Sequence, residues 1–285
     1  MAILSIQSHV AFGHVGNDAI TLPLQRLRRE VWAVHTVMFA AHAGYGVPRG
    51  PVFPPETVTA VVGGLEERGL LPRCSAVLSG YLGSAAMGEA VLDALDRVRR
   101  ANPEALYCCD PVMGDAAPGV YVRDGIPEFM KARAIPAADI ATPNAFEMTL
   151  LTGLRPDTLS TALDGCRALS AMGPETVLLT SLERDGTPDN CIEMMVYRGG
   201  DAWIVATPKF DLTPAPNGAG DLTAALFLAH FIETRRPEEA LARTASSIHA
   251  VFSETQRAGT RELALLAAQD SLVDPAIRFT ASKVP

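Results

Sequence analysis

The sequence predicts an α/β fold, a three-layer αβα sandwich whose central sheet is mostly parallel. Short apolar runs alternate with longer amphipathic stretches along all 285 residues, and no linker or change of composition divides them. Hydrophobic residues make up 48% of the chain and charged residues 20%, which excludes disordered and low-complexity classes. A chain of this length can bury a large core without disulfides or structural metal, so we expect one domain over residues 1–285.

Six apolar runs fit strands that are buried on both faces of a sheet. They are short, and all except residues 31–38 end at polar or turn-forming residues. The runs span residues 2–6, 31–38, 76–78, 106–109, 140–141 and 176–179. Residues 192–198 and 202–206 flank Gly199-Gly200-Asp201 and instead predict a hairpin at one edge of the sheet.

Helical periodicity fills the intervals between these runs. Residues 84–100 place Met87, Val91 and Leu95 on one face, and Ser84 is a suitable N-cap. Residues 161–172 and 237–252 show the same pattern. Strands that alternate with helices form βαβ units, which give a parallel sheet with helices on both faces.

Polar residues follow several of the predicted strands. In open α/β sheets, ligands bind outside the carboxyl ends of the strands, where such side chains converge. The polar strand ends are Ser8-His9, Ser79-Gly80-Tyr81, Asp110, Thr142-Pro143-Asn144 and Thr180-Ser181. This distribution predicts an enzyme site at that edge of the sheet.

The charge balance limits the kinds of binding partner, and the cysteine pattern indicates the redox state of the compartment. The chain has 24 Lys+Arg against 32 Asp+Glu, a net charge of −8, which argues against nucleic-acid and anionic-membrane binding. No apolar run approaches the ~20 residues of a membrane span, and the first residues do not resemble a signal peptide. The 5 cysteines have no CxxC spacing, so neither a disulfide framework nor a zinc site is expected. We expect a reducing, cytoplasmic setting.

The most informative segment is Gly218-Ala219-Gly220-Asp221, which precedes an apolar helix predicted over residues 223–232. The two glycines permit close backbone approach, and the N-terminus of the helix presents free N–H groups to an anion such as phosphate. The alternative is a tight turn in which Asp221 only caps the helix.

Several common site signatures are absent. No lysine follows a glycine, so there is no P-loop, and no G-x-G-x-x-G, H-E-x-x-H or G-x-S-x-G motif occurs. The 6 histidines show no metal-ligand spacing. His9 and His42 lie near predicted strand ends, where a hydrogen-bonded structural role is favoured over catalysis.

Two further segments carry carboxylates at strand ends. Asp110 and Asp115 flank Pro111-Val112-Met113-Gly114, a pattern that suits Mg²⁺ or, alternatively, a turn with a solvated Asp115. Asn144 and Glu147 have the spacing of a capping box at the start of a helix, which is the structural alternative to a ligand role.

These segments occur together in one known family. The segments are Ser5-Ile6-Gln7-Ser8-His9-Val10 with Gly16-Asn17, Ser79-Gly80-Tyr81, Asp110-Pro111-Val112-Met113-Gly114-Asp115, Thr142-Pro143-Asn144-Ala145-Phe146-Glu147 and Gly218-Ala219-Gly220-Asp221. By these motifs the chain resembles the pyridoxal kinases, vitamin B6 kinases of the ribokinase-like superfamily. The resemblance covers nearly the whole chain.

The resemblance implies ATP-dependent phosphorylation of the 5′-hydroxymethyl group of pyridoxal. Asp221 would be the general base, and the amides of Gly218, Ala219 and Gly220 would stabilise the transferred phosphoryl group. Substrate contacts would come from Ser8, Val10, His42, Ala43, Gly44, Tyr81 and Asp221. The loop at residues 114–121 would cover the site.

The resemblance also implies cofactors, nucleotide contacts and assembly. Asp110 and Glu147 would hold Mg²⁺, with a monovalent cation, K⁺ or Na⁺, as a second ion. ATP-binding residues would be Asp110, Thr142, Asn144, Glu147, Thr180, Ser181, Thr207, Pro208, Lys209 and Phe210. The family implies a homodimer.

Three positions depart from the family pattern, and one of them is Asn217, which precedes Gly218-Ala219-Gly220-Asp221. Ala43 stands where the family usually has threonine, and Thr180 stands where many bacterial members have lysine. A lost buried hydroxyl contact costs about 1 kcal/mol. Two alternatives therefore stay open: a kinase for another hydroxymethyl heterocycle such as hydroxymethylpyrimidine, and a weakened, non-catalytic B6-binding protein.

Overall fold

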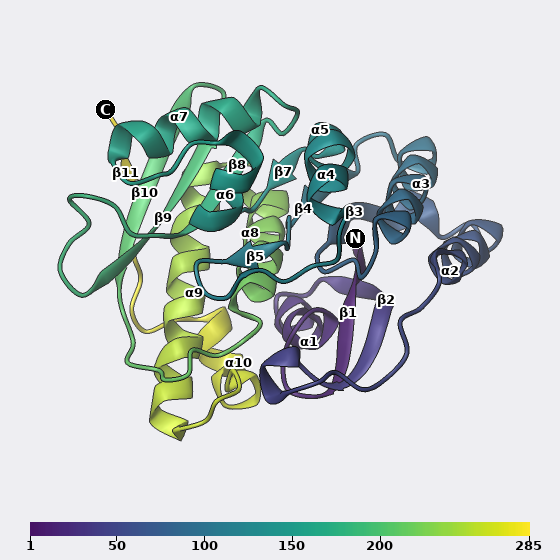
Figure 1. Cartoon of the computed structure of the whole chain (residues 1–285), viewed down its shortest axis with the longest axis horizontal. Helices are drawn as coiled ribbons and strands as arrows, with labels where there is room; N and C mark the ends of the chain where they lie inside the picture. Colours follow the sequence, from purple (N-terminus) through teal and green to yellow (C-terminus); the bar gives the residue numbers. More distant parts are fainter.

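A nine-stranded sheet forms the middle layer of the fold (Figure 1). The computed structural model describes all 285 residues. The strands are β1 (Ala2–Phe12), β2 (Glu30–Ala41), β3 (Cys74–Ser79), β4 (Leu106–Cys109), β7 (Ile140–Ala141), β8 (Thr176–Leu182), β9 (Cys191–Arg198), β10 (Asp201–Pro208) and β11 (Ser282–Lys283). Their order is β11-β10-β9-β8-β7-β4-β3-β1-β2. Strands β2 through β8 in this order pair in parallel, and β9, β10 and β11 add an antiparallel edge.

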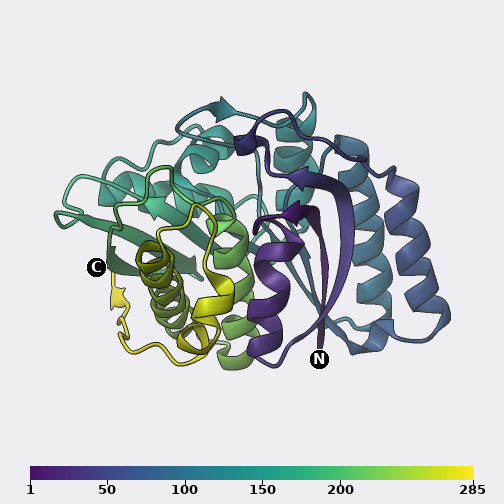
Figure 2. The same ribbon diagram turned by 90° about the horizontal axis from the view of Figure 1, so that it is seen from below.

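Helices cover both faces of the sheet, as the sequence predicts. The helices are α1 (Asn17–Arg26), α2 (Pro55–Glu67), α3 (Ala85–Ala101), α4 (Ile126–Phe129), α5 (Ile135–Ala137), α6 (Ala145–Thr152), α7 (Leu159–Ser170), α8 (Ala219–Thr234), α9 (Pro237–Ala258) and α10 (Leu265–Val273). Figure 2 shows α1, α8 and α9 side by side over one face. No helix combines the length and the apolar character needed to cross a membrane.

Each face of the sheet has its own core. Neighbouring residues of one strand point to opposite faces, so Cys108 packs with the α1, α8 and α9 side and Cys109 with the α2–α7 side. A smaller cluster under α10 joins Leu222 of α8 to Val251 of α9. The fold class is therefore confirmed, with the antiparallel hairpin of β9 and β10 at the predicted edge.

Strand β1 is longer than its apolar run predicts. We expected it to end before Ser8 and His9, but these residues lie within β1, because β2 continues to pair with it as far as Phe12 and Ala41. Strand β3 stops earlier, at the Ile6–Ser79 pair. The chain beyond Ile6 is thus flanked by a neighbour on one side only, which leaves room for a site at that edge.

The predicted bounds of the helices agree with the structure to different degrees. Ser84 caps α3 by accepting a hydrogen bond from the Met87 N–H at 3.1 Å, as predicted. Helix α7 begins two residues earlier than its prediction, where Thr158 supplies the cap, and α9 continues past Phe252 to Ala258. The segment predicted as a loop over residues 114–121 contains a small ribbon, β5 (Gly114–Asp115) and β6 (Gly119–Val120).

Candidate active site

The glycine-rich segment forms the start of α8 at the carboxyl edge of the sheet. The helix begins at Ala219, four residues before the predicted start. Gly218 has a left-handed φ of 85°, and a Cβ placed on it would lie 1.9 Å from the His14 carbonyl oxygen. Glycine is therefore required at 218 on both counts. A Cβ on Gly220 would find Asp110 Oδ2 as its nearest neighbour, at 4.0 Å, so the helix start faces this carboxylate.

Asp221 lies in the first turn of α8 and contacts the N-terminal segment. Its Oδ2 accepts a hydrogen bond from the Gly16 N–H at 2.9 Å. Its Oδ1 has no hydrogen-bond partner and lies 3.5 Å from the Cβ position of Gly80. Burial raises the pKa of Asp221 to about 6, and the Gly16 bond opposes that rise. A carboxylate with one free oxygen and this pKa can accept a proton near neutral pH.

Asp110 is a buried carboxylate, 5% exposed, directly after β4. Thr142 donates a hydrogen bond from Oγ1 to Asp110 Oδ1 at 3.1 Å, and nothing binds Oδ2. Burial, and then the charges of Glu147 and Asp221, raise the pKa of Asp110 well above its usual range. The three acidic groups therefore concentrate negative charge that no cationic side chain offsets.

Glu147 fastens helix α6 to the segment after β4. It forms the predicted capping box: the Glu147 N–H donates to Asn144 Oδ1 at 2.8 Å, and the Asn144 N–H donates to Glu147 Oε2 at 3.0 Å. Oε1 accepts from the Met113 N–H at 2.9 Å, and Asn144 Nδ2 donates to the Gly114 carbonyl oxygen at 2.9 Å. Burial raises the pKa of Glu147 to about 7. The structural alternative is confirmed, and each oxygen still has a lone pair for a ligand.

These carboxylates fit a divalent cation that keeps part of its water shell. No group of three or more His, Cys, Asp and Glu side chains is arranged as a complete metal site. Mg²⁺ is commonly held by one or two carboxylates, with waters and substrate phosphates completing its shell. The free Oδ2 of Asp110 and the negative charges of Glu147 and Asp221 near it agree with such a site.

Six of the ten residues predicted to contact ATP lie at the ends of β8 and β10. Both strands pair antiparallel with β9, so their carboxyl ends lie at the same edge. Thr180 is 8% exposed and its N–H donates to the Pro143 carbonyl oxygen at 2.9 Å, while Ser181 is exposed with a φ of 51°. The neighbouring segment is Thr207, Pro208, Lys209 and Phe210, and Lys209 Nζ pairs with Glu183 Oε2 at 2.5 Å.

Among the predicted substrate residues, Ser8 lies near Asp221. Gly16 adjoins both residues, because its N–H donates to Asp221 Oδ2 and a Cβ placed on it would clash with Ser8 Oγ. The Val10 N–H donates to Asp18 Oδ2 at 2.7 Å, and His9 Nδ1 lies 2.8 Å from the same oxygen. A hydrogen-bonded structural role for His9 is thus confirmed.

A second group of predicted substrate residues lies in the turn of residues 42–46. His42 Nδ1 accepts a hydrogen bond from the Gly44 N–H at 3.0 Å, which confirms its structural role, and burial lowers the pKa of His42. A Cβ on Gly44 would lie 3.3 Å from Asn217 Nδ2, so this turn adjoins the glycine-rich segment. Ala43 is exposed. Tyr81 is half-buried, and its carbonyl oxygen accepts from Thr36 Oγ1 at 2.8 Å.

Two residues at this turn were missed by the sequence analysis. Glu262 accepts hydrogen bonds from Tyr45 Oη at 2.6 Å and from the His14 N–H at 2.8 Å. Arg261 donates to the Gly44 carbonyl oxygen at 2.6 Å and stacks 4.0 Å over the Tyr45 ring. They follow α9, more than 200 residues along the chain from the turn, and no local pattern in the sequence marks them.

Comparison with known proteins agrees with this arrangement. A family model described as phosphomethylpyrimidine kinase matches residues 56–265, well over half of the chain. Together with the fold and the site, this match defines the class as a ribokinase-like α/β kinase.

The relatives give the particular family. The chain is 54% identical to pyridoxal kinase PdxY of Rubrobacter xylanophilus over 99% of this chain and 97% of that protein. It is 50% identical to pyridoxal kinase PdxY of Deinococcus radiodurans, over 99% and 96% of the two chains. The structure of pyridoxal kinase from Leishmania donovani in complex with ADP and pyridoxamine superposes with a TM-score of 0.92 at 28% identity, over 100% of this chain and 99% of that chain. The chain belongs to the pyridoxal kinase family.

Proposed function

We propose that this chain transfers the γ-phosphoryl group of ATP to the 5′-hydroxymethyl oxygen of pyridoxal, giving pyridoxal 5′-phosphate and ADP. The observation that carries the proposal is the position of Asp221, in the first turn of α8, bonded to Gly16 and with one oxygen free. The relatives named pyridoxal kinase and the L. donovani complex with ADP and pyridoxamine support the choice of substrates.

The proposed roles divide between Asp221 and the helix start. Asp221 removes the proton of the hydroxyl group as its oxygen attacks phosphorus. The backbone N–H groups at Gly218, Ala219 and Gly220 and the positive end of the α8 dipole stabilise the charge that spreads over the phosphoryl oxygens. Ser8, Val10, Tyr81 and the turn carrying His42, Ala43 and Gly44 hold the pyridine ring near Asp221.

We place the cation at Asp110 and Glu147. Bound Mg²⁺ would neutralise charge on the phosphates of ATP. Asp110 offers the free oxygen, and Glu147, whose oxygens already accept backbone N–H groups, is expected to act through water. A monovalent cation, K⁺ or Na⁺, is proposed as the second ion, with Thr142 and Asn144 close by.

We further propose a homodimer in a reducing, cytoplasmic setting. Several exposed apolar side chains lie near the carboxyl ends of β1 and β2 and in the turn after β2. Phe12 is 58% exposed, Met38 42% and Val47 89%. All five cysteines are free, and four of them are buried. Sedimentation velocity ultracentrifugation tests the dimer: a single species at the monomer mass at micromolar concentration would contradict it.

The decisive experiment measures pyridoxal 5′-phosphate and ADP formation with Mg-ATP for the wild type and for Asp221→Asn. We expect Asp221→Asn to lower kcat by about 10²–10⁴-fold. The matched control is Asp96→Asn, an exposed aspartate on α3, which should leave kcat unchanged. Undiminished turnover by Asp221→Asn would exclude Asp221 as the base.

The family-model description favours one second candidate, a kinase for hydroxymethylpyrimidine. The two acceptors are compared by kcat/KM under identical conditions. A larger kcat/KM for hydroxymethylpyrimidine than for pyridoxal would favour the second candidate. Tight pyridoxal binding without ADP release would instead identify a non-catalytic B6-binding protein, weakened at Ala43 and Thr180.

A further inference from the structure

A cavity of about 510 Å³ lies at the opposite end of α8 from Asp221. It opens between the ends of α1 and α8, the first turns of α9 and the segment after α10. His230 lines it and lies nine residues after Asp221 on α8, which is about 14 Å along the helix axis. The cavity is therefore separate from the candidate active site, and its volume falls within the range of small-molecule sites, roughly 300–1,000 Å³.

The lining of this cavity is positively charged in an acidic protein. Its charged side chains are Arg26, Arg28, Arg243, Arg278, Glu233 and Glu239. Four arginines against two glutamates leave the lining with more positive than negative side chains, although the whole chain carries −8. Asp270 and Asp274, outside the lining, pair with Arg26 and Arg278, so Arg28 is the arginine that offers an unbalanced positive charge to an anion.

Three of these arginines can turn to a ligand. Arg28 is exposed and forms no side-chain hydrogen bond or ion pair. Arg26 and Arg278 pair with Asp270 and Asp274 at 2.5 Å each, but those partners are 88% and 80% exposed. Exposed pairs of this kind contribute little, so an incoming anion can replace them. Guanidinium groups bind phosphate oxygens in bidentate fashion.

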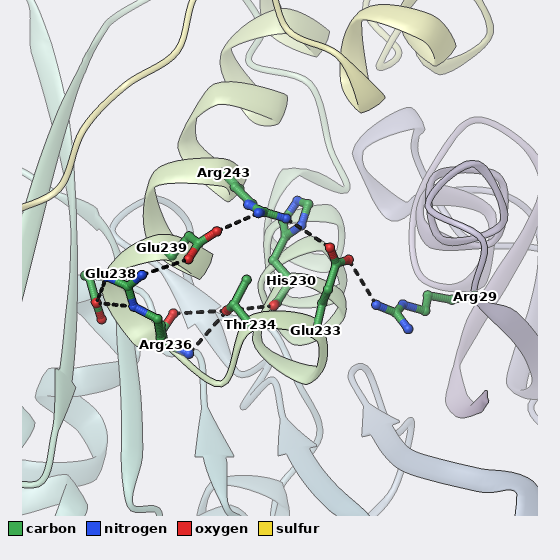
Figure 3. A network of polar contacts seen from close by, with 8 residues as sticks. All are labelled: Arg29, His230, Glu233, Thr234, Arg236, Glu238, Glu239 and Arg243. Atoms are coloured by element: carbon green, nitrogen blue, oxygen red, sulfur yellow. Dashed lines mark hydrogen bonds and ion pairs between the residues drawn. The ribbon is translucent and has the colours of Figure 1, made fainter.

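The fourth arginine belongs to a fixed wall. Figure 3 shows Arg243 between two carboxylates, with Glu233 Oε1 at 3.2 Å and Glu239 Oε1 at 2.5 Å. Glu233 also accepts from Arg29 at 3.2 Å. This network holds the ends of α1, α8 and α9 together around the cavity.

His230 provides an independent indication of a ligand. It is only 6% exposed, and its Nε2 has no hydrogen-bond partner. Burial lowers the pKa of His230 to about 4, so the imidazole is neutral at pH 7. A buried nitrogen without a partner is costly, and buried polar groups that lack one in the free protein commonly acquire one from a ligand or water.

The remaining walls are apolar. Leu27, Val273, Pro275 and Phe279 line the cavity beside the arginines. A ligand that fills it therefore needs both an anionic group and an apolar body. A phosphomonoester carries close to two negative charges at pH 7, so it can take the place of both Asp270 and Asp274 beside Arg26 and Arg278, which a monocarboxylate cannot do.

We propose that this cavity is a second ligand site, which binds a small organic phosphomonoester. Arg26, Arg28 and Arg278 bind the phosphate, and the apolar walls contact the organic body. The His230 ring, whose Nε2 is shielded from solvent in the free protein, turns to bond to one of the ligand's polar atoms. This site does not depend on the proposed kinase activity.

The test is isothermal titration of the full chain with phenyl phosphate. We expect saturable binding that weakens about tenfold or more in Arg28→Gln/Arg278→Gln, while Arg100→Gln, an exposed arginine on α3, leaves it unchanged. Because the two substitutions lie away from Asp221, binding at the active site would not respond to them. Absence of saturable binding, or equal affinity in the double variant, would overturn the proposal.

Three further ligands test separately the contributions of the phosphate group and of the apolar body. Inorganic phosphate, benzoate and benzyl alcohol should each bind more weakly than phenyl phosphate. Inorganic phosphate of equal affinity would overturn the role of the apolar walls, and benzoate of equal affinity would overturn the choice of a phosphomonoester.

His230→Phe tests the buried nitrogen. The variant should melt at the wild-type temperature or above, since a buried polar atom without a partner is removed, and its affinity for phenyl phosphate should fall about threefold or more. A folded His230→Phe protein with wild-type affinity would contradict the role of His230.

Discussion

Asp221 has two different oxygens, and the difference defines its chemistry. Oδ2 is fixed by the Gly16 N–H, while Oδ1 remains free on the side of Gly80. Its raised pKa results mainly from burial. Burial makes Asp221 a better base, and it also lowers the free energy of unfolding when Asp221 is ionised. Both effects can be measured.

The first prediction concerns the pH dependence of catalysis. Because the pKa of Asp221 is about 6, kcat/KM for pyridoxal should be level near neutral pH and fall about tenfold per pH unit below pH 6. A steady-state pH profile measures this. A profile that stays flat down to pH 4.5 would contradict a carboxylate base with this pKa.

The second prediction concerns stability. The folded pKa of Asp221 lies above its unfolded value, so the folded state binds this proton more tightly. It loses stability as pH rises from about 4 to about 6, and the loss is complete above that range. Asp221→Asn should therefore increase the free energy of unfolding by about 1–3 kcal/mol at pH 8, and the gain should vanish near pH 4. Urea denaturation at both pH values tests this, with Asp96→Asn as the control expected to show no such gain.

At the scale of elements, two contacts fix the segments that line the site. Arg261 and Glu262 hold the turn of residues 42–46, and the Asn144–Glu147 capping box ties α6 to the segment after β4. Each contact fixes the position of one segment that lines the candidate active site.

The third prediction tests the turn. Glu262→Gln keeps the side-chain shape but replaces charge-assisted hydrogen bonds to Tyr45 and His14 with neutral ones. We expect KM for pyridoxal to rise about five- to tenfold with a smaller change in kcat. Glu128→Gln, at an exposed position on α4, serves as the control. An unchanged KM in Glu262→Gln would show that the turn does not hold substrate.

The fourth prediction compares two helix caps. Asn144→Ala and Thr158→Ala each remove an N-cap, and each should cost about 1–2 kcal/mol of stability. Only Asn144→Ala should also raise KM for ATP, because Asn144 also binds the Gly114 carbonyl oxygen. Equal effects of the two variants on KM would assign Asn144 a purely structural role.

At the scale of the whole molecule, phosphate binding does not need a basic protein. The chain carries −8, and of its lysines only Lys209 falls in the predicted nucleotide segment, where it is paired with Glu183. We infer that phosphate charge is met by the N–H groups of α8 and by a cation on Asp110. The acidic surplus argues against nucleic acid as a partner, but it is compatible with a nucleotide.

The fifth prediction follows from this charge balance. Chelation with EDTA should abolish turnover, and added Mg²⁺ should restore it. Asp110→Asn should raise the Mg²⁺ concentration for half-maximal rate by about tenfold, because it removes the free carboxylate oxygen. An Asp110→Asn protein with the wild-type Mg²⁺ dependence would exclude Asp110 from the cation site.

The sequence by itself determined what depends on short-range pattern. Alternating apolar and amphipathic stretches predicted the layered fold, Ser84 and Asn144 predicted two helix starts, and Gly218 marked a turn that only glycine accommodates. These features arise from interactions between residues near one another in the chain, so the residues themselves specify them.

Only the tertiary structure decided the rest. It extended β1 past Ser8 because β2 pairs with it there, and it brought Glu262 to Tyr45 and Gly16 to Asp221 across more than 200 residues. It also gathered arginines from α1, α9 and the C-terminal segment around His230. Such contacts depend on how packed elements meet, and no local periodicity encodes them.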